Sequence, residues 1–354
     1  MTTVAIDFGT SNTVISVIDS QKKVPTSLRF PHISRIFQQR RQDGEIVEMP
    51  VIPSLVFIQA GHQWILGQQV RAKRLGLRDS EKERLFKAFK RDLVADFQSP
   101  PRHLEGVSYS PELVSERFLL EIWQQLDQQN IIPQKVIFTV PIEAFERYLD
   151  WFREMGQKLG VDQVQIVDES TAAALGYAVH RPGALVLVVD FGGGTLDLSL
   201  VRTIPPESPH LPLKAEVIAK SGAYLGGEDI DQWIVEDYLR SQGLSPSGIS
   251  KGSWQSLLDI AEKTKIKLSR ENQAKESWFD DENFMSYEIN LNREKFEEIL
   301  EEQQFLGQLR ESLDEVLNFA LSRGINKSDI QQVLLVGGSC LIPAVQQIIL
   351  SYFG

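Results

Sequence analysis

Two short segments of this chain repeat one pattern of residue types: an apolar strand, the triplet Asp-Phe-Gly, a turn of small residues, and a second strand of alternating polarity. Asp7-Phe8-Gly9 opens the first copy, and Asp190-Phe191-Gly192 opens the second 183 residues later (190 − 7). A strand that turns on glycine and small hydroxyl residues exposes backbone N–H groups at its tip, and such groups bind phosphate oxygens. A carboxylate directly before the turn is placed to hold a hydrated divalent cation. The repeat therefore predicts two lobes that bind one nucleotide from opposite sides.

Two further glycine pairs, Gly226-Gly227 and Gly337-Gly338, lie at the start of predicted helices. The first N–H groups of a helix have no partner within the helix and lie at the positive end of its dipole, which favours phosphate or ribose oxygens. Each pair, taken singly, is also consistent with a simple turn into a helix.

A polar stripe is predicted on a helix over 254–269. Glu262, Lys265 and Ser269 lie at offsets 0, 3 and 7 along it. At about 100° per residue, these offsets place the three side chains within roughly one sixth of a turn. Such a stripe suits hydrogen bonds to a ribose and an adenine edge, although a solvated face with an i,i+3 ion pair gives the same pattern.

Two charged residues are candidates for chemistry at a phosphate. Glu169 begins a predicted helix, where an acid either compensates the helix dipole or positions and deprotonates an attacking water. Lys90 lies among several surface cations, most of which we expect to be solvated, and it is the candidate to reach a γ-phosphate.

Composition excludes several other classes of protein. The net charge of −11 argues against non-specific nucleic-acid binding, which needs a basic field. A hydrophobic content of 42% and a charged content of 24% over 354 residues are typical of a soluble globular protein of two lobes. No signal peptide or apolar stretch of about 18 residues is found, so we expect a cytoplasmic protein without a membrane span. The five histidines have no ligand spacing, which predicts no zinc site, and Cys340 is expected to be buried.

The elements that must position these residues follow from the spacing of apolar residues. We expect strands over 136–140, 163–167 and 333–336, with another around 284–291. We expect helices over 111–129, up to about Leu159, from 168 onwards, over 254–269 and over 293–322. Apolar residues also recur at helical spacing within 68–97, and Pro182-Gly183 is the expected hinge between the lobes.

Nine blocks of residues occur along the chain in a fixed order. They are Ile-Asp-Phe-Gly-Thr-Ser (6–11), Ile-Pro-Ser-x-Val (52–56), Phe-Lys-Arg (89–91), Thr-Val-Pro (139–141), Asp-Glu-Ser-Thr-Ala-Ala-Ala (168–174), Asp-Phe-Gly-Gly-Gly-Thr-Leu-Asp (190–197), Leu-Gly-Gly-Glu-Asp-Ile-Asp (225–231), Glu-Lys-x-Lys-x-x-Leu-Ser (262–269) and Val-Gly-Gly-Ser-x-x-Ile-Pro (336–343). In this order they resemble the nucleotide-binding domain of the heat shock protein 70 family of chaperones. The resemblance covers nearly all of the chain.

The resemblance implies an α/β fold of the actin-like ATPase type, with two ribonuclease-H-like subdomains that each carry an inserted subdomain. Lobe I would span 1–183, with its core in 1–30 and 111–183 and its insertion in 31–110. Lobe II would span 184–354, with its core in 184–225 and 303–354 and its insertion in 226–302. We expect the last part of lobe I and the peptide-binding domain of the family to be absent from this chain.

The resemblance also implies ATP or ADP with Mg²⁺ and K⁺ as cofactors, and it assigns roles by motif position. Phosphate contacts would come from Gly9, Thr10, Ser11 and Asn12 in lobe I and from Gly192, Gly193, Gly194 and Thr195 in lobe II. Asp7 and Asp190 would hold the metal through water, and Asp190 would also belong to the catalytic residues. Lys90 and Glu169 would flank the attacking water, with Thr195 near the γ-phosphate. Ribose and adenine would meet Glu262, Lys265 and Ser269, with Gly226 and Gly227 near the ribose or phosphates and Gly337, Gly338 and Ser339 on the adenosine side.

The adenine site departs from the family pattern. Ile266 and Leu341 stand where the family usually clamps the base between two arginines. Apolar packing can replace the stacking, but cation–π energy of about 1 kcal/mol would be lost. We therefore predict weaker or less adenine-selective binding. Asp168-Glu169-Ser170 also replaces the usual Asn-Glu-Pro.

The leading hypothesis is an ATP-binding, slowly hydrolysing domain of a chaperone similar to heat shock protein 70. The partners that the resemblance implies are a J-domain co-chaperone and a nucleotide exchange factor. Client peptides would bind only through the absent domain, and we expect a monomer that binds neither nucleic acid nor membrane. Two alternatives stay open: a nucleotide-dependent switch or scaffold that does not hydrolyse ATP, and an actin-like ATPase that forms filaments.

Overall fold

The computed structural model describes residues 2–19, 25–40, 46–76, 78, 80–94, 98–140, 145–178, 183–205, 214–280 and 284–354. The chain is a mixed α/β protein of two compact units, Met1–Glu169 (unit 1) and Ser170–Gly354 (unit 2). Pro141 of the Thr-Val-Pro block and Pro182 of the expected hinge lie outside the described residues. The predicted boundaries of the lobes and of their inserted subdomains stay predictions.

The sheet of unit 1 is built on the first Asp-Phe-Gly hairpin. β1 (Thr2–Phe8) and β2 (Asn12–Asp19) pair antiparallel, and β11 (Lys135–Val140) and β12 (Gln163–Asp168) follow in parallel on the far side of β1. β2 also pairs with β5 (Ile46–Pro53) and the short β3 (Thr26–Ser27), and β5 pairs with β4 (Arg35–Arg40). The order is β12-β11-β1-β2-β5-β4. Because parallel strands end at the same edge, Asp7 is brought opposite Thr139.

Aromatic residues from two helices cover this sheet. Along β1 the side chains of Val4, Ile6 and Phe8 are buried and that of Asp7 is exposed, as the two-residue period of a strand requires. The Phe8 ring lies 5.9 Å from Phe118 of α3 (Pro111–Gln128) and 6.4 Å from Phe152 of α4 (Phe145–Lys158). The predicted helix over 111–129 is confirmed, and Ser110 caps it by accepting from the N–H of Leu113.

A second group of short elements in unit 1 lies between β5 and α3 in the sequence. It comprises α1 (Gln68–Ala72), α2 (Phe89–Val94), the sheet of β6 (Leu55–Gln59), β7 (Gln63–Leu66) and β8 (Leu85–Lys87), and the hairpin of β9 (Arg102–Leu104) and β10 (Val107–Tyr109). The helical spacing within 68–97 is misleading for Leu85 and Phe86, which lie in β8. β8 satisfies its backbone groups by pairing with β6, where Phe86 faces Val56. This pairing overrides the local periodicity.

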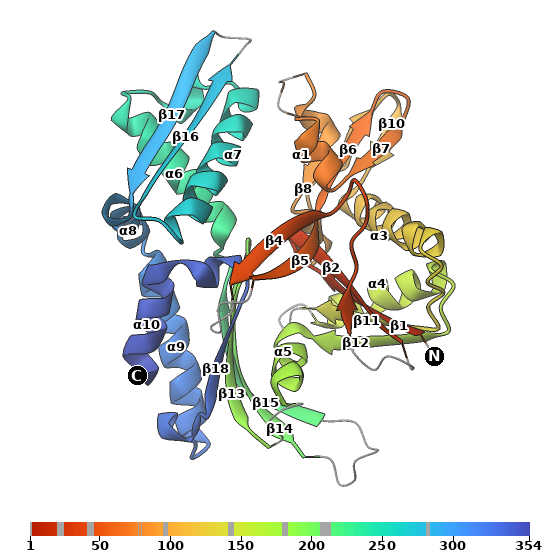
Figure 1. The fold of residues 1–354 in the computed structure, drawn as a ribbon, viewed down its shortest axis with the longest axis vertical. Coiled ribbons are helices and arrows are strands. Elements are labelled where there is room, and N and C mark those ends of the chain that lie inside the picture. The colour runs from red at the N-terminus through yellow and green to blue at the C-terminus, as the bar shows by residue number, and fades with distance from the viewer. Residues whose placement is uncertain are drawn as a thin grey trace. The chain divides into compact units, whose positions relative to one another are not determined.

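Unit 2 repeats the hairpin and the parallel strand of unit 1. β13 (Leu185–Phe191), β14 (Leu196–Ile204) and β15 (Lys214–Ala223) pair antiparallel, and β18 (Gln332–Val336) pairs in parallel with β13. α9 (Phe305–Ser322) and α10 (Pro343–Phe353) run along this sheet (Figure 1). Leu185, Leu187 and Val189 pack in the same core as these helices, while Val186 and Val188 pack with α5 (Glu169–Ala178) on the other face. The strand before the second turn is thus buried on both faces, which explains its unbroken apolar run.

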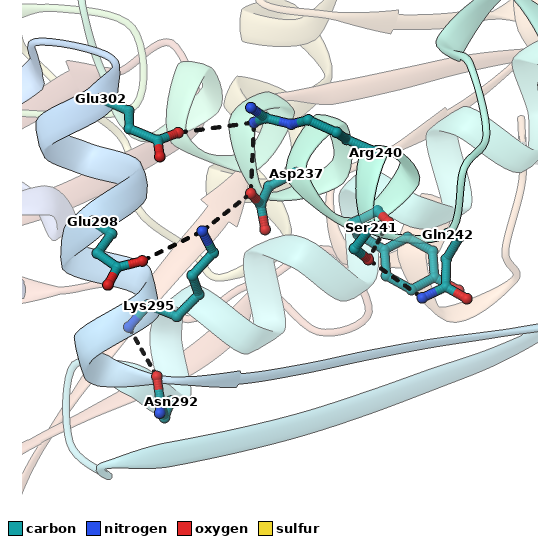
Figure 2. A network of polar contacts seen from close by, with 9 residues as sticks. Asp237, Arg240, Ser241, Gln242, Asn292, Lys295, Glu298 and Glu302 are labelled. Carbon is teal, nitrogen blue, oxygen red and sulfur yellow. Dashed lines mark hydrogen bonds and ion pairs between the residues drawn. The ribbon is translucent and has the colours of Figure 1, made fainter.

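The remaining part of unit 2 consists of α6 (Gly227–Ser241), α7 (Lys251–Leu268), the hairpin of β16 (Gln273–Asp280) and β17 (Met285–Asn292), and α8 (Arg293–Glu302). Ion pairs join α6 to α8, as Figure 2 shows. Asp237 accepts from Arg240 and Lys295 at 3.5 Å each, and Arg240 lies 3.9 Å from Glu302. Arg240 and Glu302 are more than half exposed, so the pair between them contributes little to stability.

Two expectations for this part were incomplete. The helix expected over 293–322 is two helices, α8 and α9, because Gln304 adopts φ +57 between them and a left-handed residue interrupts the helix. Strand β16 was not predicted, since its residues Gln273–Asp280 are mostly polar and only their pairing with β17 defines it. Among the described residues, no helix is long and apolar enough to cross a bilayer.

The phenylalanine of the second Asp-Phe-Gly triplet fixes that turn to the core. The Phe191 side chain is 0% exposed and stacks on Phe305 of α9 at 4.8 Å. We expect Phe191→Ala to lower the free energy of unfolding by about 3–5 kcal/mol, because the truncation leaves a cavity under the turn. Denaturant unfolding measures this change. Phe284, 82% exposed in the same unit, provides the matched control Phe284→Ala, and equal stability of the two variants would contradict the prediction.

Candidate functional site

The first turn, Gly9-Thr10-Ser11, joins β1 to β2, and Ser54 donates hydrogen bonds to two of its carbonyls. The Ser54 N–H donates to the carbonyl oxygen of Ser11 at 2.9 Å, and its Oγ donates to that of Gly9 at 2.7 Å. A Cβ on Gly9 would overlap the carbonyl oxygen of Asn12, so only glycine fits there. Sequence reasoning quoted Ser54 within the Ile-Pro-Ser block but assigned it no role.

Asp7 is separated from this turn by Phe8, and its side chain is exposed. Thr139 Oγ1 donates to Asp7 Oδ1 at 2.8 Å and so orients the carboxylate. Within the described ranges no three His, Cys, Asp or Glu side chains are grouped to hold a metal ion directly. One exposed, oriented carboxylate does fit Mg²⁺, which usually keeps several waters and uses only one or two carboxylates.

Lys90 and Glu169, which the sequence places 79 residues apart, form an ion pair in unit 1. Lys90 Nζ lies 2.8 Å from Glu169 Oε1, and the two side chains are 5% and 20% exposed. α2 begins at Phe89, whose buried ring lies 6.0 Å from Phe8, so the aromatic core under the first turn also positions Lys90. Lys90 is therefore not the solvated surface cation of the alternative interpretation.

The second turn, Gly192 to Thr195, closes on itself in unit 2, where the Gly192 N–H donates to the Thr195 carbonyl at 3.0 Å. As in the first turn, its carbonyls accept hydrogen bonds from other segments. The N–H of Gly227 donates to Gly192 O at 3.0 Å, and that of Glu228 donates to Gly193 O at 2.8 Å. Ser339 Oγ donates to Gly192 O at 2.8 Å.

The structure thus brings together all three glycine segments of unit 2. A Cβ on Gly226 would overlap the Gly193 carbonyl, and one on Gly337, at φ +87, would overlap that of Phe191. These close approaches explain why glycine stands at both positions. The first N–H groups of α6, predicted to bind phosphate or ribose, are used by the turn, so direct contacts from Gly226 and Gly227 to a ligand stay a prediction.

Lys265 links α7 to the start of α6. Its Nζ donates to the Gly227 carbonyl at 2.6 Å and lies 2.8 Å from Asp231 Oδ1. Ser269 Oγ donates to the Lys265 carbonyl at 3.2 Å, and Glu262 lies one turn before Lys265 on the same helix. The predicted stripe is therefore on one helix, with its lysine engaged inside unit 2. Ile266 and Leu341 are 36% and 45% exposed, as side chains that could pack on a base must be.

Asp231 is a buried carboxyl group of this site, and its pKa is shifted. Burial raises the pKa of Asp231 to about 7; the nearby ammonium of Lys265 opposes this shift, and the charge of Glu262 adds to it. Cys340 is buried, as expected, and burial raises the pKa of its thiol to about 12.

Each of the two α/β units carries a strand hairpin with a glycine turn, and the family that matches this chain implies the actin-like ATPase fold. A family model described as Hsp70 protein matches residues 76–354. The chain belongs to the Hsp70 family, whose members are chaperones that bind ATP and ADP and are generally ATPases. The matched range includes Lys90, Glu169 and the whole second turn, whereas the first turn precedes it.

The buried Asp231 gives a pH-dependent stability that can be measured. Its folded-state pKa of about 7 lies above the ordinary aspartate value of 3.8, so the folded chain binds an extra proton between these pH values. Stability therefore falls as pH rises from about 4 to 7, by at most about 1.4 kcal/mol per pH unit from this group, and levels off above. Denaturant midpoints from pH 5 to 8 should show this slope in wild type and a smaller one in Asp231→Asn. Identical slopes in the two proteins would contradict the shift.

Proposed function

We propose that the chain binds Mg-ATP and hydrolyses it slowly, as the nucleotide-binding domain of an Hsp70-type chaperone. The observation that carries this proposal is the similarity of the two turns. Each follows a strand that carries an aspartate, each contains glycine, and the carbonyls of each accept hydrogen bonds from another segment of the chain. A strand tip arranged in this way presents N–H groups to an anion. The family match supports the adenine nucleotide as that anion.

The phosphates would be bound by both turns of the chain. Thr10, Ser11 and Asn12 offer side chains as well as backbone, whereas the second turn offers mostly glycine backbone and Thr195. Asp7 and Asp190 would each hold Mg²⁺ through water, and the ion would supply charge neutralisation at the phosphate oxygens. Thr139 would keep the Asp7 carboxylate directed toward the metal side of the turn.

The ion pair of Lys90 and Glu169 would act on the attacking water. The buried ammonium holds the Glu169 carboxylate in one position, and a fixed carboxylate oxygen can accept a hydrogen bond from water and orient it. Lys90 also adds positive charge where negative charge develops on the transferred phosphoryl group. Positioning and charge are what this reaction needs most, since it requires no covalent intermediate on the protein.

Adenosine would be bound by unit 2. Glu262, Lys265 and Ser269 of α7 would contact the ribose and adenine edge, and Gly337 to Ser339 would line the other side. The exposed Ile266 and Leu341 would pack on the base without the charge of arginine, which supports weaker discrimination among bases.

Phosphate release from ATP tests the catalytic part of the proposal. Lys90→Met and Glu169→Gln should each lower the rate by about 100-fold or more, because each removes a positioned charge, while ATP affinity changes by only a few fold. Lys87→Met, an exposed lysine on the neighbouring strand β8, is the matched control and should keep the wild-type rate.

Variants that release phosphate at the wild-type rate would contradict these roles. Nucleotide binding by wild type without any release would instead favour the alternative of a switch that does not hydrolyse ATP. Titration of each variant with ATP separates loss of binding from loss of chemistry.

A further inference from the structure

The Ile-Pro-Ser-x-Val block contains Ser54, a buried residue to which the proposed chemistry gives no role. We propose that Ser54 is a positioning residue for phosphate binding. By donating hydrogen bonds to two carbonyls of the first turn, it keeps them pointing toward itself, so that the turn directs its N–H groups to the phosphates. The inference rests on the proposed function, because it concerns how the same turn binds its ligand.

Ser54 makes three hydrogen bonds at one place. Its N–H donates to Ser11 O at 2.9 Å, and its Oγ donates to Gly9 O at 2.7 Å. Thr13 Oγ1 lies 3.0 Å from Ser54 Oγ, and since the Ser54 proton is used toward Gly9, the Thr13 hydroxyl donates. Ser54 and Thr13 are 2% and 0% exposed, so water cannot replace these bonds.

The sequence explains why Ser54 reaches the turn. β5 pairs with β2 through Ile52 opposite Thr13 and Pro53 opposite Asn12. Proline has no N–H, so the first N–H available beyond Ile52 is that of Ser54, and it meets Ser11 O at the end of the ladder.

The direction of the N–H groups follows from the planar trans peptide, in which the C=O of one residue and the N–H of the next point in opposite directions. Because Gly9 O is held by Ser54, the N–H of Thr10 must point away from Ser54. No acceptor for this N–H is found among the described residues. The turn therefore keeps one N–H directed outward and ready for an anion.

The second turn supports the inference independently. Gly192 stands at the same place in its Asp-Phe-Gly triplet as Gly9, and its carbonyl also accepts from a buried serine, Ser339 Oγ, at 2.8 Å. The two serines come from unrelated segments, one after β5 and one after β18. The same carbonyl is thus held by a serine hydroxyl in both copies, which marks this bond as a requirement of the turn.

The test compares a ligand with phosphates and one without. ADP with Mg²⁺ is titrated into the full chain by calorimetry, and adenosine by ligand-observed NMR. We expect Ser54→Ala to weaken ADP about tenfold and to change adenosine by less than about twofold, because the freed Gly9 carbonyl lets the turn rotate. Ser115→Ala removes another fully buried serine hydroxyl of unit 1, one without a hydrogen-bond partner, and should change neither affinity.

Two results would overturn the inference, and they differ. If wild type binds ADP more tightly than adenosine and folded Ser54→Ala keeps that ratio, Ser54 has no positioning role. If wild type binds the two ligands equally, the phosphate site itself fails and the inference fails with it. Should Ser54→Ala not fold, Thr13→Val removes the donor to Ser54 Oγ with little change of shape; we expect an ADP affinity about threefold weaker, and an unchanged value would overturn the inference.

Discussion

In both units of the protein the carbonyls of the glycine turn accept hydrogen bonds from other segments of the chain, and this constraint determines how each turn is oriented. In unit 1 Ser54 satisfies two carbonyls of the turn, and in unit 2 the start of α6 and Ser339 do so. Peptide planarity then fixes where the N–H groups point. Glycine at Gly9 and Gly226 follows from the same constraint, since a Cβ at either position would overlap a backbone carbonyl. The glycines of this chain are therefore needed for close approach as well as for turning.

The triplet Asp-Phe-Gly divides three tasks among three consecutive residues. The phenylalanine is buried in both copies, against Phe118 of α3 in unit 1 and against Phe305 of α9 in unit 2. The strand period then places the aspartate on the opposite face, where it is free of the aromatic core, and the glycine begins the turn. In unit 1 the same aromatic core contains Phe89 and so positions Lys90 next to Glu169. Core packing and the candidate chemistry depend on the same few rings.

The sequence predicted the parts of this arrangement that local patterns encode. The repeated hairpin, the helix over 111–129 and the family were all confirmed. What it missed depends on contacts between distant segments: β8 is a strand because β6 pairs with it, and Ser54 matters because β5 carries it to a turn 43 residues earlier in the chain (54 − 11). Lys265 was predicted to lie on a helix, as it does in α7, but its bonds to Gly227 and Asp231 arise only when α6 packs beside α7.

The central claim is that this member of the Hsp70 family binds an adenine nucleotide through its two turns. The most direct measurement is an equilibrium titration of the full chain with a fluorescent ATP analogue, with and without Mg²⁺. The account predicts saturable binding well below millimolar nucleotide that strengthens when Mg²⁺ is present, because Asp7 and Asp190 are proposed to hold the ion through water. The account would be contradicted if no binding occurred at millimolar nucleotide, or if the nucleotide affinity were the same with and without Mg²⁺.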